Sequence, residues 1–169
     1  FWTKDPAPLL PYLSEIDQLG YQYYFQFTLT PYSQKIEPNL RDKAKIIQTF
    51  IELSKRIGKE RVRWRYDPII LNGMFSVSYH QERFQWLCEQ LSPFTENVTI
   101  SFADWYRGLD MSLLRKITEE ELEEIGSIIG KTAKLYGISA ETCCESVDFE
   151  KYDIRHGSCI DPKLLERIC

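Results

Sequence analysis

Apolar and polar residues repeat along this chain with two different periods, and the two kinds of segment alternate. Short segments rich in β-branched and aromatic residues repeat with the period of two that is typical of strands, and longer ones with the 3.6-residue period of amphipathic helices. The expected strands are Phe1–Thr3, Tyr23–Thr30, Arg61–Tyr66, Val98–Phe102 and Thr142–Glu145. The expected helices are Ala7–Leu19, Leu40–Ile57, Ser78–Leu91, Glu119–Tyr136 and Pro162–Ile168. This order predicts an α/β fold of parallel strands joined by crossover helices.

Capping residues mark the ends of several expected helices. Thr118 and Glu121 have the spacing of a capping box, and Asp161 before Pro162 is the expected N-cap of the last helix. Three glycines follow helical segments, where a left-handed residue commonly ends a helix. They are Gly20, Gly58 and Gly137.

Each expected strand has one apolar and one polar side. In the third strand, the apolar and polar sets are Val62, Trp64 and Tyr66 against Arg63, Arg65 and Asp67. Strands covered by helices on both faces tend to be apolar throughout, whereas a barrel directs polar side chains into its interior. The pattern therefore favours a partial (β/α) TIM-like barrel. The alternative is a sheet with one solvated face, which the long helix after every strand disfavours.

The length of 169 residues suits one domain. The chain begins inside an expected strand, without Met, and ends on a helical pattern without a cap. We therefore expect residues 1–169 to form a single domain that is an internal fragment of a larger (β/α) barrel protein. Exposed barrel edges in such a fragment would allow self-association.

The charge balance excludes some classes of partner. There are 21 basic and 25 acidic residues, a formal net charge of −4, and the longest charged run is acidic. A broad positive face for nucleic acid is therefore not expected. No apolar run reaches the roughly 20 residues that cross a bilayer, and no leader opens the chain. We expect a cytoplasmic protein that binds neither nucleic acid nor membrane.

The cysteines do not form a recognised framework. They are Cys88, Cys143, Cys144, Cys159 and Cys169, an odd number without C-x-x-C spacing. This pattern argues against secreted disulfides and against a self-contained zinc site, so we expect reduced, partly buried thiols and assign no metal ligand. Cys143 and Cys159 are still informative, because their proximity near strand ends would favour a metal or redox role of the larger protein.

Polar residues near the carboxyl ends of the expected strands are the candidate site, since β/α barrels carry their functional residues there. The candidate ligand-binding residues are Lys4, Gln26, Thr28, Arg65, Asp67, Ser101, Asp104 and Glu145. Burying Arg63 and Arg65 requires carboxylates or an anionic ligand beside them, and Asp67 and Glu145 are the expected partners. A purely structural network of ion pairs is the alternative.

Histidines and the remaining aromatic residues add little to this site. His80, at the start of a helix, is expected at the surface or as a cap. His156 shares a loop with Cys159 and Asp161 that could donate to a metal, although the capping role of Asp161 is favoured. Trp105 and Tyr106 could line a ligand site after the fourth strand.

Six strings along the whole chain resemble a known family. They are Phe1-Trp-Thr-Lys-Asp-Pro6, Tyr23-Tyr-Phe-Gln-Phe-Thr-Leu-Thr-Pro-Tyr32, Ile36-Glu-Pro-Asn39, Arg63-Trp-Arg-Tyr-Asp-Pro68, Thr142-Cys-Cys-Glu145 and His156-Gly-Ser-Cys-Ile-Asp161. Together and in this order they resemble the bacterial family catalogued as domain of unknown function 1848. The resemblance implies further amino-terminal strands and a carboxyl-terminal cysteine cluster like that of radical S-adenosylmethionine enzymes. The C-x3-C-x2-C spacing of such a cluster is absent from this chain.

The resemblance implies the central barrel segment of an iron–sulfur, radical-type enzyme that binds a small polar or anionic substrate. A [4Fe-4S] cluster and S-adenosylmethionine are then expected in the larger protein and no cofactor in this segment. The alternative is a non-catalytic small-ligand-binding or scaffold module. A hydrolase-like metal barrel using Asp67, Asp104, Glu145 and His156 is least favoured, because such sites usually need several strand-end histidines.

Overall fold

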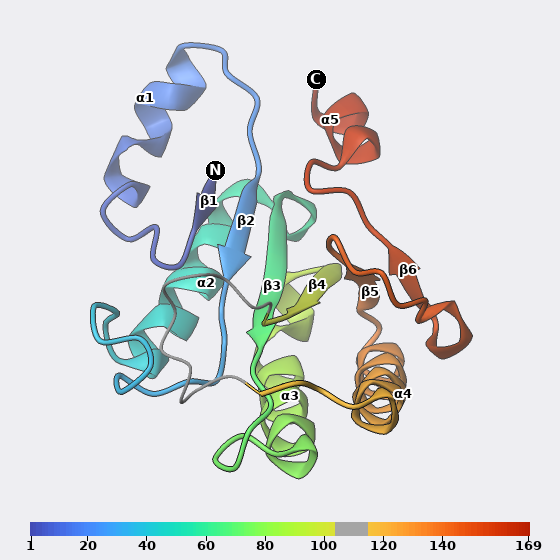
Figure 1. Cartoon of the computed structure of the whole chain (residues 1–169). Coiled ribbons are helices and arrows are strands. Elements are labelled where there is room, and N and C mark those ends of the chain that lie inside the picture. Colours follow the sequence, from blue (N-terminus) through green and yellow to red (C-terminus); the bar gives the residue numbers. More distant parts are fainter. Residues whose placement is uncertain (104–114) are drawn as a thin grey trace.

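A sheet of six parallel strands organises the chain (Figure 1). The computed structural model describes residues 1–103 and 115–169. The strands are β1 (Trp2–Thr3), β2 (Phe25–Thr28), β3 (Val62–Ile69), β4 (Asn97–Phe102), β5 (Ser139–Thr142) and β6 (Ile154–His156). They lie side by side in chain order, all neighbouring pairs are parallel, and β1 and β6 are the edges. The predicted α/β fold with parallel strands is confirmed.

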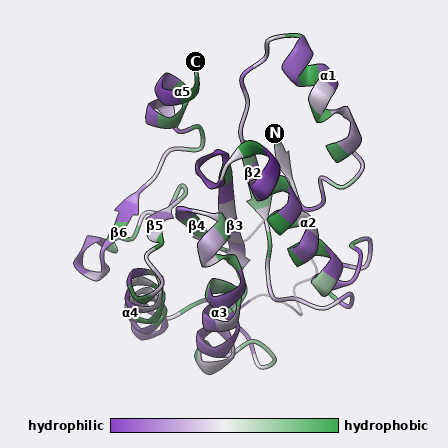
Figure 2. Cartoon of the chain, turned by 180° about the vertical axis from the view of Figure 1, so that it is seen from behind, coloured by the Kyte–Doolittle hydropathy of each residue, from purple (hydrophilic) through white to green (hydrophobic). Residues whose placement is uncertain are grey.

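Helices connect these strands, and the longer ones cover one face of the sheet. They are α1 (Leu13–Gln18), α2 (Lys43–Ile57), α3 (Val77–Leu91), α4 (Glu119–Leu135) and α5 (Pro162–Ile168). Viewed from behind, α2, α3 and α4 lie on the same side of the strands (Figure 2). The middle helix, α3, contacts both α2 and α4. In the described part of the chain, no helix is both long and apolar enough to cross a membrane.

The local signals at helix ends are confirmed. The three glycines have φ angles of 78°, 95° and 67° in chain order, so each uses the left-handed region. Thr118 accepts from the backbone N–H of Glu121, whose side chain accepts from that of Thr118, which completes the capping box. Asp161 caps α5 by accepting from the backbone N–H of Leu164.

Two predictions at the carboxyl-terminal strands were wrong. The fifth strand was placed at Thr142–Glu145, but β5 begins at Ser139 and ends at Thr142. The strand β6 was not predicted at all. Both errors have the same cause, since β5 contains few β-branched residues and β6 has only three residues, two of them exposed, which leaves almost no periodic signal.

The core lies between the sheet and the covering helices, and aromatic rings fill it. Phe27 of β2 packs against Phe50 of α2, with ring centroids 5.0 Å apart. Trp64 of β3 stacks on Phe84 of α3 at 5.3 Å, and its indole N–H donates to the carbonyl of Leu29 at 2.9 Å. The apolar side chains of each strand thus face the helices. The alternating polar side chains lie on the opposite face of the sheet.

His80 was expected at the surface, and this prediction was wrong. Only 1% of the residue is exposed. Its Nε2 lies 2.9 Å from the carbonyl oxygen of Ile70 and its Nδ1 lies 2.7 Å from the hydroxyl of Tyr66. Because a carbonyl only accepts, Nε2 carries the proton and Nδ1 accepts from Tyr66. The imidazole therefore links α3 to β3 and the loop that follows it.

We expect this buried imidazole to make stability depend on pH. Burial lowers the pKa of His80 below its ordinary value of 6.5, and the bond to Ile70 only partly offsets that effect. The unfolded chain then binds more protons, so the free energy of unfolding falls as pH drops below about 6.5. Urea unfolding between pH 8 and pH 5 should show a smaller decrease for His80→Gln. The exposed His156→Gln variant is the control, and equal slopes for wild type and His80→Gln would contradict this role.

A close contact between α4 and the segment before β6 depends on a glycine. A Cβ atom added to Gly130 would lie 1.9 Å from the carbonyl oxygen of Tyr152, so only glycine lets the two backbones approach this closely. The hydroxyl of Tyr152 donates to Glu123 on the same helix. The approach fixes the segment that leads into β6.

Gly130→Ala should therefore destabilise the protein, although alanine is the better helix former by about 1 kcal/mol. The overlap requires the backbone to shift, and we expect a net loss of about 1–3 kcal/mol in the free energy of unfolding. Urea unfolding measures it. Ser127→Ala on the same helix should stay within about 0.5 kcal/mol of wild type. A stabilised Gly130→Ala variant would show that this contact is not made.

Candidate functional site

Polar side chains from adjacent strands form a continuous strip on the face of the sheet that the long helices leave open. The parallel register aligns Thr28, Arg65, Thr99 and Glu141 across β2, β3, β4 and β5. Residues aligned in register project to the same side, so the strip follows directly from the polar parity of each strand. The polar side predicted for Thr28, Arg65 and Thr99 agrees with this register, whereas Glu141 lay outside the predicted fifth strand.

Arg65 lies at the centre of this strip and is almost fully buried, with 2% of the residue exposed. Its Nε and Nη2 donate to Oδ2 of Asp67 at 3.1 and 2.5 Å, and its Nη1 donates to Oε1 of Gln26 at 2.8 Å. The ring of Trp2 covers the guanidinium, with Cζ 4.2 Å from the ring centroid. Protein groups on three strands therefore hold Arg65 in place.

Electrostatics favour the charged guanidinium. Burial alone would lower the pKa of Arg65, but hydrogen bonds to Cys143 and Asp67 and the negative charges of these groups raise it above its ordinary value. Asp67, one of the carboxylates expected to pair with the buried arginines, therefore pairs with Arg65. A buried cation that is paired and hydrogen-bonded avoids most of the desolvation penalty that an isolated one would carry.

The second oxygen of Asp67 accepts a hydrogen bond from a neighbouring strand. Ser101 donates to Oδ1 of Asp67. Thr30, just beyond β2 and of the same polar parity as Thr28, is buried to 1% exposure. Within residues 1–103 and 115–169, the Thr30 hydroxyl has no hydrogen-bond partner. Thr30 and Asp67 each lie two residues beyond the aligned pair of Thr28 and Arg65, so this end of β2 and β3 carries a fixed carboxylate and a buried hydroxyl without a described partner.

A second ion cluster lies toward the amino-terminal ends of the strands. Arg63 donates to Glu141 and to Asp161, each at 2.7 Å, and Thr99 donates to Glu141 at 2.9 Å. Asp161 follows β6 in the chain, so this pairing brings the segment 157–161 across the polar face. The same segment accepts a hydrogen bond from Gln26 at the Cys159 carbonyl. It therefore covers part of the strip.

Other predicted site residues lie at the margins of this network. Lys4 pairs with Glu37 at 2.6 Å, and Glu37 also pairs with Lys43 at 2.9 Å. These two cations outweigh the effect of burial and lower the pKa of Glu37. Glu145 accepts from the backbone N–H of Phe102 at 2.8 Å. Asp104, Trp105 and Tyr106 lie outside the described residues.

Three cysteine sulfurs meet beside Arg65. The Sγ atom of Cys159 lies 3.5 Å from that of Cys143 and 3.5 Å from that of Cys144, and the latter two are 3.9 Å apart. All three thiols are free. The sequence analysis named the proximity of Cys143 and Cys159 as informative but assigned no metal ligand, and it placed β5 too late in the chain to predict that proximity. With the correct strand, Cys143 continues the polar parity of Glu141 and points to the same face as Arg65.

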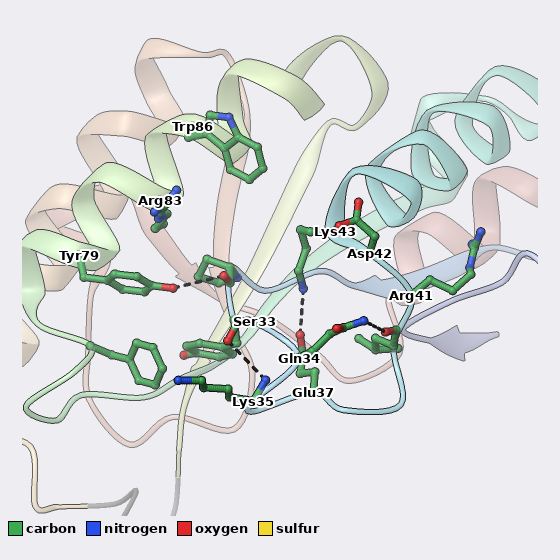
Figure 3. Close-up of a pocket in the computed structure, with 14 residues that line it drawn as sticks. Ser33, Gln34, Lys35, Glu37, Arg41, Asp42, Lys43, Tyr79, Arg83 and Trp86 are labelled. Carbon is green, nitrogen blue, oxygen red and sulfur yellow. Dashed lines mark hydrogen bonds and ion pairs between the residues drawn. The ribbon is translucent and has the colours of Figure 1, made fainter.

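A separate hollow lies between α2 and α3 and has a volume of about 680 Å³. Figure 3 shows side chains of α3 on one side and those of the loop after β2 and the start of α2 on the other. Its charged lining residues are Lys35, Glu37, Arg41, Asp42, Lys43 and Arg83. Four are basic and two are acidic, which leaves the lining with an excess of positive charge. Sequence reasoning did not anticipate this hollow.

The fold and site define an α/β protein whose parallel sheet carries a polar, ion-paired face and three clustered thiols. The family model described as Domain of unknown function (DUF1848) matches residues 1–169, so the chain belongs to this family. The family predicted from the six sequence strings is therefore confirmed. No curated protein and no solved structure matches the chain.

We expect Asp67→Asn to be strongly destabilising, because it leaves the buried Arg65 without its counter-charge. The loss in the free energy of unfolding should be on the order of 3 kcal/mol, and Arg65→Met should recover part of it in the double variant. Asp153→Asn, which breaks the exposed pair with Lys134, is the matched control and should change stability by less than about 1 kcal/mol. Equal effects of the two single variants would mean that Arg65 does not depend on Asp67.

Proposed function

We propose that this chain is the central part of a (β/α) barrel whose polar face binds a small polar or anionic ligand. Consecutive parallel strands in chain order, with long helices on one face and polar side chains on the other, support the barrel. A doubly wound sheet would carry helices on both faces and apolar strands. In a barrel, the polar strip lines the interior and its carboxyl-terminal end forms the mouth where ligands bind.

The buried hydroxyl of Thr30, at the end of the strand next to Asp67, is the observation that carries the ligand proposal. Buried hydroxyls nearly always have a hydrogen-bond partner, and the partner of Thr30 is not among the described side chains. A polar atom of a bound ligand would satisfy this hydroxyl. The carboxylate of Asp67 would accept from a hydroxyl or amine of the same ligand.

Arg65 has a positioning role in this proposal. Most of its donors are already engaged by Asp67 and Gln26, and Trp2 covers its face. It therefore fixes the orientation of Asp67 and contributes a positive potential that favours an anionic group on the ligand. Ser101 holds the other carboxylate oxygen, so Asp67 is restrained at both ends.

The family resemblance also suggests a radical-type enzyme with a [4Fe-4S] cluster and S-adenosylmethionine. The cysteines of this chain do not fit such a cluster. In a cubane, each thiolate binds a different iron, whereas Cys143, Cys144 and Cys159 lie as close together as ligands of one ion. In the radical-enzyme proposal, residues outside this chain would bind the cluster, and the polar face described above would bind the substrate.

A non-catalytic anion-binding module is the second candidate, and the hollow between α2 and α3 favours it. Arg83 and Lys35 are basic lining residues, and Tyr79 and Trp86 add aromatic surface (Figure 3). An anion bound there would contact α3 and the loop after β2 rather than the carboxyl-terminal edge of the sheet. The two candidates therefore depend on different side chains.

Thr30→Val separates the two candidates. The substitution keeps the shape but removes the buried hydroxyl, so the free chain should gain roughly 1 kcal/mol of stability. Binding at the proposed site should weaken about tenfold, as expected for the loss of one hydrogen bond. Tryptophan fluorescence, in which Trp2 reports on the site, measures binding in titrations with inorganic phosphate, succinate and a neutral sugar.

Thr132→Val on α4 is the control and should leave both properties unchanged. Saturable binding that is weakened by Thr30→Val and retained by Arg83→Gln supports the site on the polar face. Binding that is lost in Arg83→Gln but unchanged in Thr30→Val places the ligand between α2 and α3 and overturns the first proposal.

A further inference from the structure

The spacing of the three clustered thiols matches the coordination sphere of a single metal ion. Zinc binds thiolates at about 2.3 Å in a tetrahedron, which sets the sulfur–sulfur distance at about 3.8 Å. The three observed distances are 3.5, 3.5 and 3.9 Å. A disulfide would instead place two sulfurs about 2.05 Å apart. The geometry corresponds to one ion that contacts all three sulfurs.

Two backbone features bring these thiols together. Cys144 has a φ of 59°, which is unusual for a residue other than glycine. Consecutive residues of an extended strand point to opposite faces, so this left-handed turn is what allows Cys143 and Cys144 to share one site. Such a conformation costs about 1 kcal/mol or more and persists where the surroundings require it.

The third thiol arrives through a close approach of the chain to β5. The backbone N–H of Gly157 donates to the carbonyl of Thr142 at 2.9 Å. A Cβ atom at Gly157 would lie 2.7 Å from the same oxygen, so glycine permits this contact. Two residues later, Cys159 reaches the end of β5 and completes the group.

Arg65 supplies a positive charge beside the thiol group. Its guanidinium lies close enough to Cys143 and Cys159 to interact with both electrostatically. Three thiolates around a divalent ion would leave one negative charge, which the guanidinium of Arg65 would balance. A charged group that donates to a metal-bound sulfur is the expected outer-sphere partner.

We propose that Cys143, Cys144 and Cys159 bind a single Zn²⁺ ion at the carboxyl-terminal end of β5, beside Arg65. Soft thiolates in tetrahedral geometry select zinc over calcium or magnesium. In residues 1–103 and 115–169, no fourth histidine, cysteine or carboxylate joins the group. The fourth position is left for water or for a ligand on the polar face. Zinc binding by these thiols does not require the ligand proposed above.

Metal binding to the whole chain tests this proposal. The chain is purified under reducing conditions, stripped with a chelator and titrated with Zn²⁺ against a chromophoric competitor. We expect one ion per chain. Cys159→Ser should weaken binding by more than roughly 100-fold, because even loss of an outer-sphere partner costs up to that factor. Cys169→Ser removes an exposed thiol outside the group and should bind like wild type.

Two further measurements on the unaltered chain keep the proposal testable if Cys159→Ser does not fold. Co²⁺ should give the visible bands of tetrahedral coordination together with thiolate charge-transfer absorption. Zn²⁺ should protect Cys143, Cys144 and Cys159, but not Cys169, from alkylation as read by mass spectrometry.

Several results would overturn the proposal. These are no uptake of Zn²⁺ or Co²⁺ by the reduced chain, binding that is unaffected in a folded Cys159→Ser variant, and reconstitution of an iron cluster with labile sulfide on these cysteines.

Discussion

The burial of one guanidinium, that of Arg65, is the constraint on which the open face of the sheet depends. A cation that is removed from water must be paired and hydrogen-bonded, or the fold loses several kcal/mol. Asp67 on the same strand, Gln26 on β2 and Trp2 on β1 meet this requirement. Each partner comes from a position that the parallel register places near Arg65, so satisfying one charge also fixes the relative position of three strands.

The two faces of the sheet solve different physical problems. On the helix face, rings such as Trp64 and Phe84 stack and remove apolar surface from water. On the other face, charges are neutralised in pairs, and the segment 157–161 is held there by Arg63 through Asp161. The pairing has a chemical consequence, because the same segment carries Cys159 to the two cysteines after β5. The ion pairs and the thiol group are therefore parts of one arrangement.

Membership of the family, by itself, assigns no reaction to this chain, whose chemical capacity lies in its side chains. The three thiol sulfurs are spaced like the ligands of one ion and not like the ligands of a cubane cluster. A fixed carboxylate, a buried hydroxyl and a thiol group lie along the carboxyl-terminal edges of neighbouring parallel strands. That edge is where β/α proteins build their sites, and it supports the proposed ligand and zinc sites.

The sequence by itself determined what depends on local periodicity and on end signals. The long helices, the parity of β2, β3 and β4, the capping box at Thr118 and the pairing of Arg65 with Asp67 could all be predicted, because they involve residues close together in the chain. The last strands could not, since β5 and β6 are short and carry few β-branched residues.

Tertiary structure alone decided which distant residues meet. The burial of His80 against Ile70, the two carboxylate partners of Arg63 and the unpartnered hydroxyl of Thr30 all depend on the register between strands and on the path of the loops. The same is true of Cys143 and Cys159, which the left-handed turn at Cys144 and the close approach at Gly157 bring together. The physical reason is that alternation along a strand fixes the face a side chain occupies, whereas its neighbours on that face are set by packing between segments far apart in sequence.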